Sequence, residues 1–150
     1  YKPTEKKIDN KQKTLNGLKI VYPKGFTKIS SDDTGETYQN DNITIAKVSG
    51  SASFGEKEAL ELIKSDLGGN KYIRHNVIED FKIKFPIGYY LSNYKSILVT
   101  SIFIIEDKFF AISIEIKPKS SIQKLEDAQK IMKEGAGIML EMIDNFKVYF

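Results

Sequence analysis

Residues Leu18–Phe26 read LKIVYPKGF, and the last nine residues of the chain, Met142–Phe150, read MIDNFKVYF. Apolar and polar side chains alternate in both segments, which is typical of short strands with one buried face. Pro23 and Gly25 interrupt the first segment, so we expect a bent strand or a hairpin that resumes at Phe26–Ile29. A long helical periodicity precedes the second segment. We therefore expect strands near both ends of the folded domain.

The interior of the chain has the period-two pattern of a sheet. We expect two short strands within Thr37–Ser49 and a strand that starts at Phe81, with Pro86 placing that strand near a sheet edge or a strand end. Further strands are predicted at Tyr89–Tyr94, Ile97–Ile105 and Phe109–Lys117, the last two joined by a hairpin at Glu106–Lys108. One face of the last strand is apolar and the other is more polar. This pattern favours an antiparallel sheet that is covered unequally on its two faces.

Two helices are predicted, one between Ser49 and the strand that starts at Phe81, and one after the last strand of the series. Ser53 and Glu56 have the spacing of a capping box, and Ser120 and Gln123 repeat it before a longer helix. Gly68-Gly69 is expected to stop the first helix. The buried stripe of the first helix is predicted to be Ala59, Leu60, Ile63 and Leu67, and that of the second is predicted to be Leu125, Ala128, Met132, Ala136, Met139 and Ile143. The second stripe keeps its phase across Gly135 and Gly137, so we expect these glycines to allow close contact with a strand.

Charge and composition limit the classes of partner. The chain has 150 residues and a formal net charge of +3, and residues 1–13 alone carry five lysines against two acidic side chains, so the remainder is neutral. A neutral body cannot supply the phosphate neutralisation that nucleic-acid binding requires, so we expect no nucleic-acid partner. We expect residues 1–17 to form a disordered basic tether and residues 18–150 to form a single domain.

The tether also indicates a cellular location. Its Lys, Asn, Thr and Gln residues and the absence of an initiator methionine lead us to expect an upstream segment that has been removed, either an export signal or a trimmed disordered end. The basic residues are 22 lysines and one arginine, Arg74, which suggests an AT-rich bacterial genome. No apolar run is long enough to cross a bilayer. We expect membrane contact only through an upstream lipid anchor.

The order of these elements resembles the PsbP-like fold. That fold is shared by the photosystem II extrinsic subunit, a Ran-binding nuclear import factor and many bacterial lipoproteins. The matching motifs are the turn Tyr22-Pro23-x-Gly25-Phe26 and the closing strand, which Phe146 opens. The resemblance covers about Leu18–Phe150. It implies an α+β domain, an α/β/α sandwich with a central, mainly antiparallel sheet, and it carries over no metal-binding or Ran-binding residues.

Motifs for catalysis or metal binding are weak. Residues 50–57 have the glycine spacing of a phosphate loop but lack its Lys-Ser/Thr pair. His75 is the only histidine and there is no cysteine, so zinc sites built from those residues are excluded, and we expect no cofactor. Asp32, Asp33 and Glu36, with Asp41 nearby, form the densest acidic cluster and are a weak candidate for calcium. Turn-forming aspartates beside Gly35 explain the same cluster, and we predict no metal site.

Tyrosines provide the first candidate for a ligand surface. Tyr72, Tyr89, Tyr90 and Tyr94 could line a groove for a sugar or a peptide, because phenols combine an apolar face with a polar end. Ordinary strand propensity is the simpler explanation for tyrosines in such a segment, and the tyrosines remain our first candidate for a ligand surface. We therefore expect an exported, lipoprotein-type, non-enzymatic binding or accessory module of the bacterial cell envelope, with an unknown protein or small ligand as its partner. The alternatives are a hydrolase with a dispersed acid and tyrosine site, and a structural subunit of an envelope complex.

Overall fold

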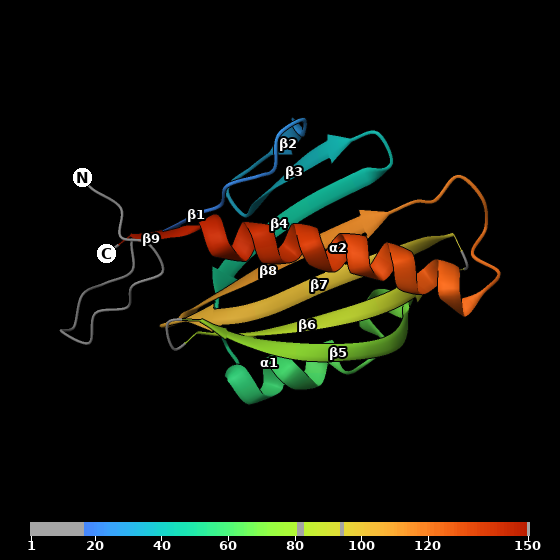
Figure 1. The fold of residues 1–150 in the computed structure, drawn as a ribbon. Coiled ribbons are helices and arrows are strands. Elements are labelled where there is room, and N and C mark those ends of the chain that lie inside the picture. The colour runs from blue at the N-terminus through green and yellow to red at the C-terminus, as the bar shows by residue number, and fades with distance from the viewer. Residues whose placement is uncertain (1–16, 81–82, 94, 150) are drawn as a thin grey trace.

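The computed structural model describes residues 17–80, 83–93 and 95–149 of the chain. In this part of the chain, a seven-stranded antiparallel sheet carries two α-helices, and a two-stranded ribbon joins the first and last strands (Figure 1). The elements are β1 (Gly17–Lys19), β2 (Thr27–Ser31), β3 (Gly35–Asn40), β4 (Ile43–Ser51), α1 (Glu56–Ile63), the 3-10 helix η1 (Leu67–Gly69), β5 (Lys71–Asp80), β6 (Ile83–Ser92), β7 (Ser96–Ile105), β8 (Lys108–Ile116), α2 (Leu125–Asn145) and β9 (Lys147–Tyr149). The predicted tether falls on residues 1–16, outside the described residues, and on Gly17, which begins β1.

The strand order in the large sheet is β2-β3-β4-β8-β7-β6-β5. Strand β8 lies between β4 and β7, and its alternate residues point to opposite faces, as the sequence predicts. In the register, Ile114 lies beside Ile45 on one side and beside Val99 on the other, and all three side chains are fully buried. This apolar face is the one that α2 covers. The hydrophobic core of the protein therefore lies between α2 and the central strands.

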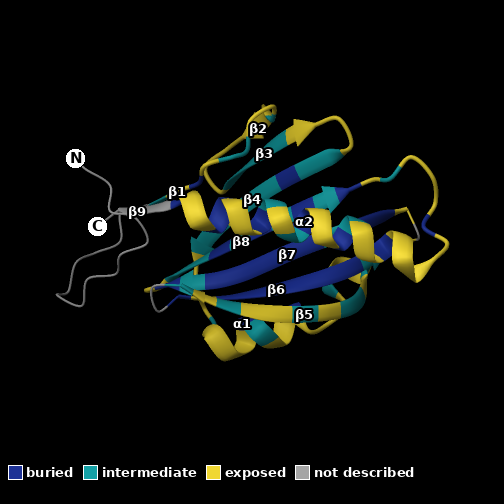
Figure 2. Ribbon diagram, in the orientation of Figure 1, coloured by how far each residue is buried: buried dark blue, intermediate teal, exposed yellow. Residues whose placement is uncertain are grey.

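The opposite face of the sheet is covered by a shorter helix. α1 packs on β6 and β7, where Ala59 and Ile63 are buried together with Ile102 of β7. Figure 1 shows α2 running across one face of the sheet and α1 lying near the β5 edge. The α/β/α arrangement and its unequal covering are thus confirmed. Figure 2 shows the consequence, because the central strands β6 and β7 are mostly buried whereas β5 is largely exposed.

Both predicted capping boxes are wrong. The N-cap of α1 is Gly55, two residues after the predicted Ser53, and the Glu58 carboxylate accepts the Gly55 N–H at 3.0 Å. α2 begins at Leu125 after Lys124, and no side chain caps its N-terminus. α1 ends at Ile63 rather than at the paired glycines. Gly68 and Gly69 do adopt positive φ angles of 62° and 80°, but they end η1, after α1 has stopped.

The strand β5 was missed by the sequence analysis. It forms the edge of the sheet beyond β6, and most of its side chains are polar, charged or partly exposed. Edge strands often carry charges, which protect the unpaired edge from other chains, so they lack a clear apolar alternation. β6 is one strand where we predicted two pieces. The pairing of β6 with β7 ends at Ile87, opposite Ser101. Pro86 lies just beyond this pair, so the N–H that proline lacks is not needed for pairing with β7.

The two terminal segments meet in space. β1 pairs antiparallel with β9, with Leu18 opposite Val148. The predicted final strand is shorter than expected, because Met142–Asn145 still belong to α2. In the first segment, the chain after β1 leaves the strand conformation, turns at Gly25 with φ 89°, and enters the large sheet as β2.

The buried side of α2 follows most of the predicted stripe, although Ala136 is only partly buried where it packs against the core. Ala128, Met132, Met139 and Ile143 are buried, whereas Leu125 at the helix start is 66% exposed. Gly135 is also buried, and a Cβ placed there would lie 2.6 Å from Cγ2 of Val99 in β7. Gly137 faces open space. Of the two glycines, only Gly135 therefore serves the close helix–strand contact that the sequence predicts.

These two glycines give a matched pair of substitutions. Gly135→Ala should lower the free energy of unfolding by about 1–3 kcal/mol, because the β-branched Val99 has little freedom to move away. Gly137→Ala should instead raise it by about 0.5–1 kcal/mol, since alanine favours the helix and meets nothing. Urea denaturation of both variants tests this. A Gly135→Ala protein as stable as Gly137→Ala would show that the helix does not rest on Val99.

Candidate functional site

The predicted tyrosine surface is divided between the two faces of the sheet. Tyr89 is buried in the core beneath α2, with the Arg74 guanidinium 5.2 Å from the centre of its ring. Tyr90 points to the other face, is fully buried, and donates its O–H to the carbonyl oxygen of Ile63 in α1. Tyr94 lies outside the described residues. Neither Tyr89 nor Tyr90 therefore presents its ring to solvent.

Burial also changes the ionisation of these phenols. It raises the pKa of Tyr90, with a smaller contribution from the neighbouring Tyr72. It raises the pKa of Tyr89 as well, against the opposing charge of Arg74. A buried phenol resists ionisation because the low-dielectric interior disfavours the charged form. Both tyrosines are held neutral and serve the packing of β6.

Among the predicted tyrosines that the structure describes, Tyr72 is the one that remains partly exposed. It lies at the start of β5, and its O–H is 2.7 Å from Nδ1 of His75. Its backbone N–H donates to the Asp66 carboxylate at 2.9 Å. The ring stands edge-on to Tyr90, with 6.3 Å between centroids. Tyr72 is thus fixed on several sides.

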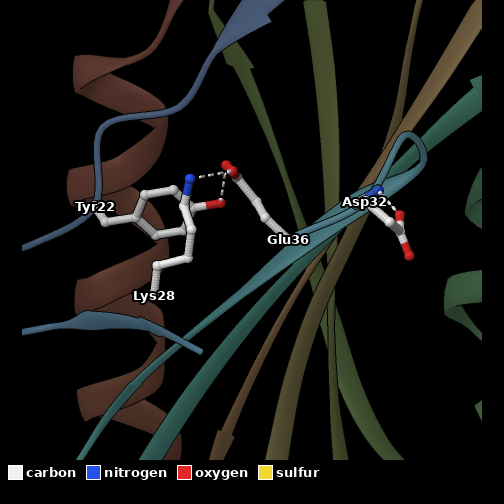
Figure 3. Close-up of polar contacts among 5 residues, drawn as sticks. Tyr22, Lys28, Asp32 and Glu36 are labelled. Carbon is white, nitrogen blue, oxygen red and sulfur yellow. Dashed lines mark hydrogen bonds and ion pairs between the residues drawn. The ribbon is translucent and has the colours of Figure 1, made fainter. Parts of the chain in front are cut away.

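The acidic cluster does not come together as a metal site. One Asp32 carboxylate oxygen accepts hydrogen bonds from the Thr34 N–H, the Thr34 O–H and the Gly35 N–H, at 2.8, 2.8 and 2.9 Å. These bonds, with the Thr34 hydroxyl first, hold the pKa of Asp32 below its ordinary value. Glu36 points away, toward Tyr22 and Lys28 (Figure 3). Among the described residues, no group of three potential ligands could hold a metal ion.

A cluster that the sequence analysis missed surrounds Glu36. The Tyr22 O–H donates to the Glu36 carboxylate at 2.7 Å, and Lys28 lies 3.8 Å from the same carboxylate (Figure 3). Tyr22 also stacks on Tyr38 with 3.7 Å between ring centroids. Burial, followed by the bond to Glu36, raises the pKa of Tyr22. These contacts fasten the turn after β1 to strands β2 and β3, which gives the Tyr-Pro-x-Gly-Phe motif a structural role.

A hollow lined in part by Tyr72 lies where α2 begins. We call it the α2 cavity, and its volume is about 420 Å³. Strands β5 and β6 form one wall, and the chain entering α2 forms the other. Its lining residues are Lys71, Tyr72, Ile73, Leu91, Ile122, Gln123, Lys124, Leu125 and Ala128. Sequence reasoning found only Tyr72 among them, because β5 was not predicted and Leu125 was placed in the core.

The walls of the α2 cavity are anchored in the core although its rim is open. Ile122 is 6% exposed and Ala128 is 5% exposed, so the start of α2 is held on both sides of Leu125. Leu125 itself is the most exposed of the large hydrophobic residues in the described chain. Lys71 and Lys124 supply the charges, and no carboxylate lines the cavity. The arrangement combines an apolar bed with two cations.

A second cavity of about 420 Å³ lies between α1 and the sheet. Its bed is apolar and includes Pro86, Ile102 and Ile104, but its charged residues have both signs. Glu56 and Lys57 come from α1, and the third charged residue, Lys84, comes from β6. It offers no net charge preference comparable to that of the α2 cavity.

Two solved structures share this architecture at low sequence identity. The solution structure of cyanobacterial PsbP (CyanoP) from Synechocystis sp. PCC 6803 matches with a TM-score of 0.55 and 10% identity, over 89% of this chain and 87% of that chain. A crystal structure from Bacteroides thetaiotaomicron VPI-5482 matches with a TM-score of 0.52 and 11% identity, over 89% of this chain and 45% of that chain. The chain has a PsbP-like fold. No family model and no curated protein matches its sequence.

The PsbP-like fold fixes the layers of the molecule, and at these identities it carries no activity with it. A hydrolase would be favoured by carboxylates that converge in one cavity with shifted pKa values. In the described part of the chain, the carboxyl group with a resolved pKa shift is that of Asp32, in an exposed turn. Function must therefore be argued from the cavities.

Among the described residues, neither helix has both the length and the apolar character that crossing a bilayer demands.

The buried phenol of Tyr90 predicts a response to alkaline pH. The pKa of a free tyrosine is 10.0, and that of Tyr90 is raised by burial, so above about pH 10 the unfolded chain releases the proton first. The free energy of unfolding should then fall as the pH rises. Tyr90→Phe should weaken this fall, and at neutral pH it should cost about 1–3 kcal/mol because the Ile63 carbonyl loses its donor. Urea titrations at neutral and alkaline pH measure both effects, and equal pH slopes would contradict the assignment.

Proposed function

We propose that this protein is a non-enzymatic binding module of the bacterial cell envelope, exported and held there by a lipid anchor upstream of Tyr1. Its ligand or partner occupies the α2 cavity. The observation that supports this proposal is the exposed Leu125 at the rim of an anchored, mostly apolar hollow. Small-molecule sites in proteins are typically concave, apolar and largely preformed.

The energetics favour an occupant that covers Leu125. Full burial of a leucine side chain is worth about 1.5–3 kcal/mol, and a leucine that remains 66% exposed leaves much of this unused. Ile73 and Leu91 extend the apolar surface next to it. Because the neighbouring Ile122 and Ala128 are already buried, an occupant gains this area without first having to order the wall.

Tyr72 gives the cavity a defined polar side. Its O–H contacts His75, and its ring is supported by Tyr90. A tyrosine held in this way loses little conformational entropy when a ligand packs on it. This keeps Tyr72 as a proposed ligand-binding residue.

The cellular part of the proposal is supported by the composition of residues 1–13. Their lysines and uncharged polar side chains suit a solvated tether between a membrane surface and a folded domain. Expression of the full-length gene in a bacterium with alkyne-labelled palmitate tests it. We expect label on the protein and its recovery with membranes. An unlabelled protein in the soluble fraction would overturn the envelope assignment.

Binding at the α2 cavity is tested with Nile red, a neutral dye whose fluorescence rises in apolar sites. The native protein should bind it, and Leu125→Asp should weaken binding by about tenfold or more, which corresponds to about 1.4 kcal/mol. Leu140→Asp is the matched control, because Leu140 is also an exposed leucine of α2, at 39%, but does not line the cavity.

The comparison of the two aspartate variants decides the proposal. Thermal unfolding should show that both are folded. Unchanged dye binding by Leu125→Asp would exclude the α2 cavity as the binding site. Equal loss in the two variants would show that the dye recognises the exposed surface of α2 in general.

A further inference from the structure

We infer that the α2 cavity binds a single-chain anionic amphiphile, with an acyl chain on the apolar bed and a carboxylate between Lys71 and Lys124. This inference rests on the proposed function, since it names the ligand class of the same site. It follows from the charges, the size and the construction of the cavity.

The charges at the cavity have one sign. Lys71 comes from the start of β5 and Lys124 is the residue before α2, so two separate elements each contribute a lysine to the lining. In the part of the chain that the structure describes, neither lysine has an ion-pair partner. An anion placed between them would gain two charge-assisted contacts. The Gln123 side chain adds a further hydrogen-bond donor to the lining.

The neighbouring carboxylates are directed elsewhere or line other surfaces. Asp66 accepts the backbone N–H of Tyr72 at 2.9 Å, which occupies one of its oxygens. Asp127 lines a different hollow, together with Lys130 and Ile131. Glu126 is exposed in the first turn of α2 and does not line the cavity. The second cavity, between α1 and the sheet, differs in this respect, because Glu56 is part of its lining.

The size of the cavity favours a ligand with a single acyl chain. Its volume of about 420 Å³ is near the lower end of the range of about 300–1,000 Å³ that small-molecule sites occupy. A medium-length acyl chain fits such a space, whereas the two chains of a membrane phospholipid do not. Ile73, Leu91 and Leu125 provide the apolar contacts along the chain.

The experiment compares ligands that share a chain and differ in charge. Decanoate, decanol and decyltrimethylammonium are titrated against the protein–Nile red complex. We expect decanoate to displace the dye at about tenfold lower concentration than decanol, and the cation to be the weakest of the three. In Lys71→Gln/Lys124→Gln the advantage of decanoate should disappear while displacement by decanol stays the same. The control Lys24→Gln/Lys133→Gln, which removes two exposed lysines away from the cavity, should behave as the native protein.

Each outcome separates the inference from the proposed function. Failure of the native protein to bind Nile red would overturn both. Dye binding with equal displacement by decanoate and decanol, or an unchanged preference in the Lys71 and Lys124 variant, would overturn the ligand class alone. Phosphatidylglycerol vesicles form a further arm. If vesicles bind in a lysine-dependent way and free decanoate does not displace the dye, the site recognises a membrane surface instead of a single acyl chain.

Discussion

The close contact between Gly135 and Val99 sets the position of α2 on the sheet. A side chain at residue 135 would meet Val99 at 2.6 Å, so the helix backbone lies nearer to β7 here than larger residues allow. Met132 and Met139 then fill the space on either side, one turn before and one turn after. With the helix in this position, its first turn extends beyond the buried part of the sheet. Ala128 is still in the core, and Leu125, one turn earlier, is not.

The two faces of the sheet are packed in different ways. The face under α2 is apolar, apart from the Ser101 hydroxyl, which is buried without a hydrogen-bond partner among the described residues. On the other face, α1 covers only the β6–β7 side, and polar side chains pair with one another. Thr100 bonds Ser113 across β7 and β8, and Ser96 bonds Glu115, both at 3.0 Å. Paired in this way, the polar groups avoid the free-energy cost that unpaired buried groups carry.

The sequence predicts the elements whose period is visible and misses those that depend on neighbours. The β7–β8 hairpin and the stripe of α2 were predicted because burial imposes regular spacing on them. The exposed edge strand β5 has no such spacing, and so the cavity wall that it forms could not be predicted. Tyr89 and Tyr90 illustrate the same limit. Alternation places them on opposite faces, but only the positions of α1 and α2 decide that both become covered.

The α2 cavity lies at the edge of the sheet, where a loop enters a helix. Its walls are the first residues of an edge strand and the connection from β8 into α2, which are the parts of a fold that vary most easily. Ile122 and Ala128 tie the start of α2 to the core. Lys124 and Leu125 beside them, and Lys71 of β5, are exposed. Substitutions at the exposed residues alter the charge and shape of the cavity and leave the buried ones untouched. At 10–11% identity, two proteins can therefore keep the same layers while this corner of the molecule binds different ligands or none.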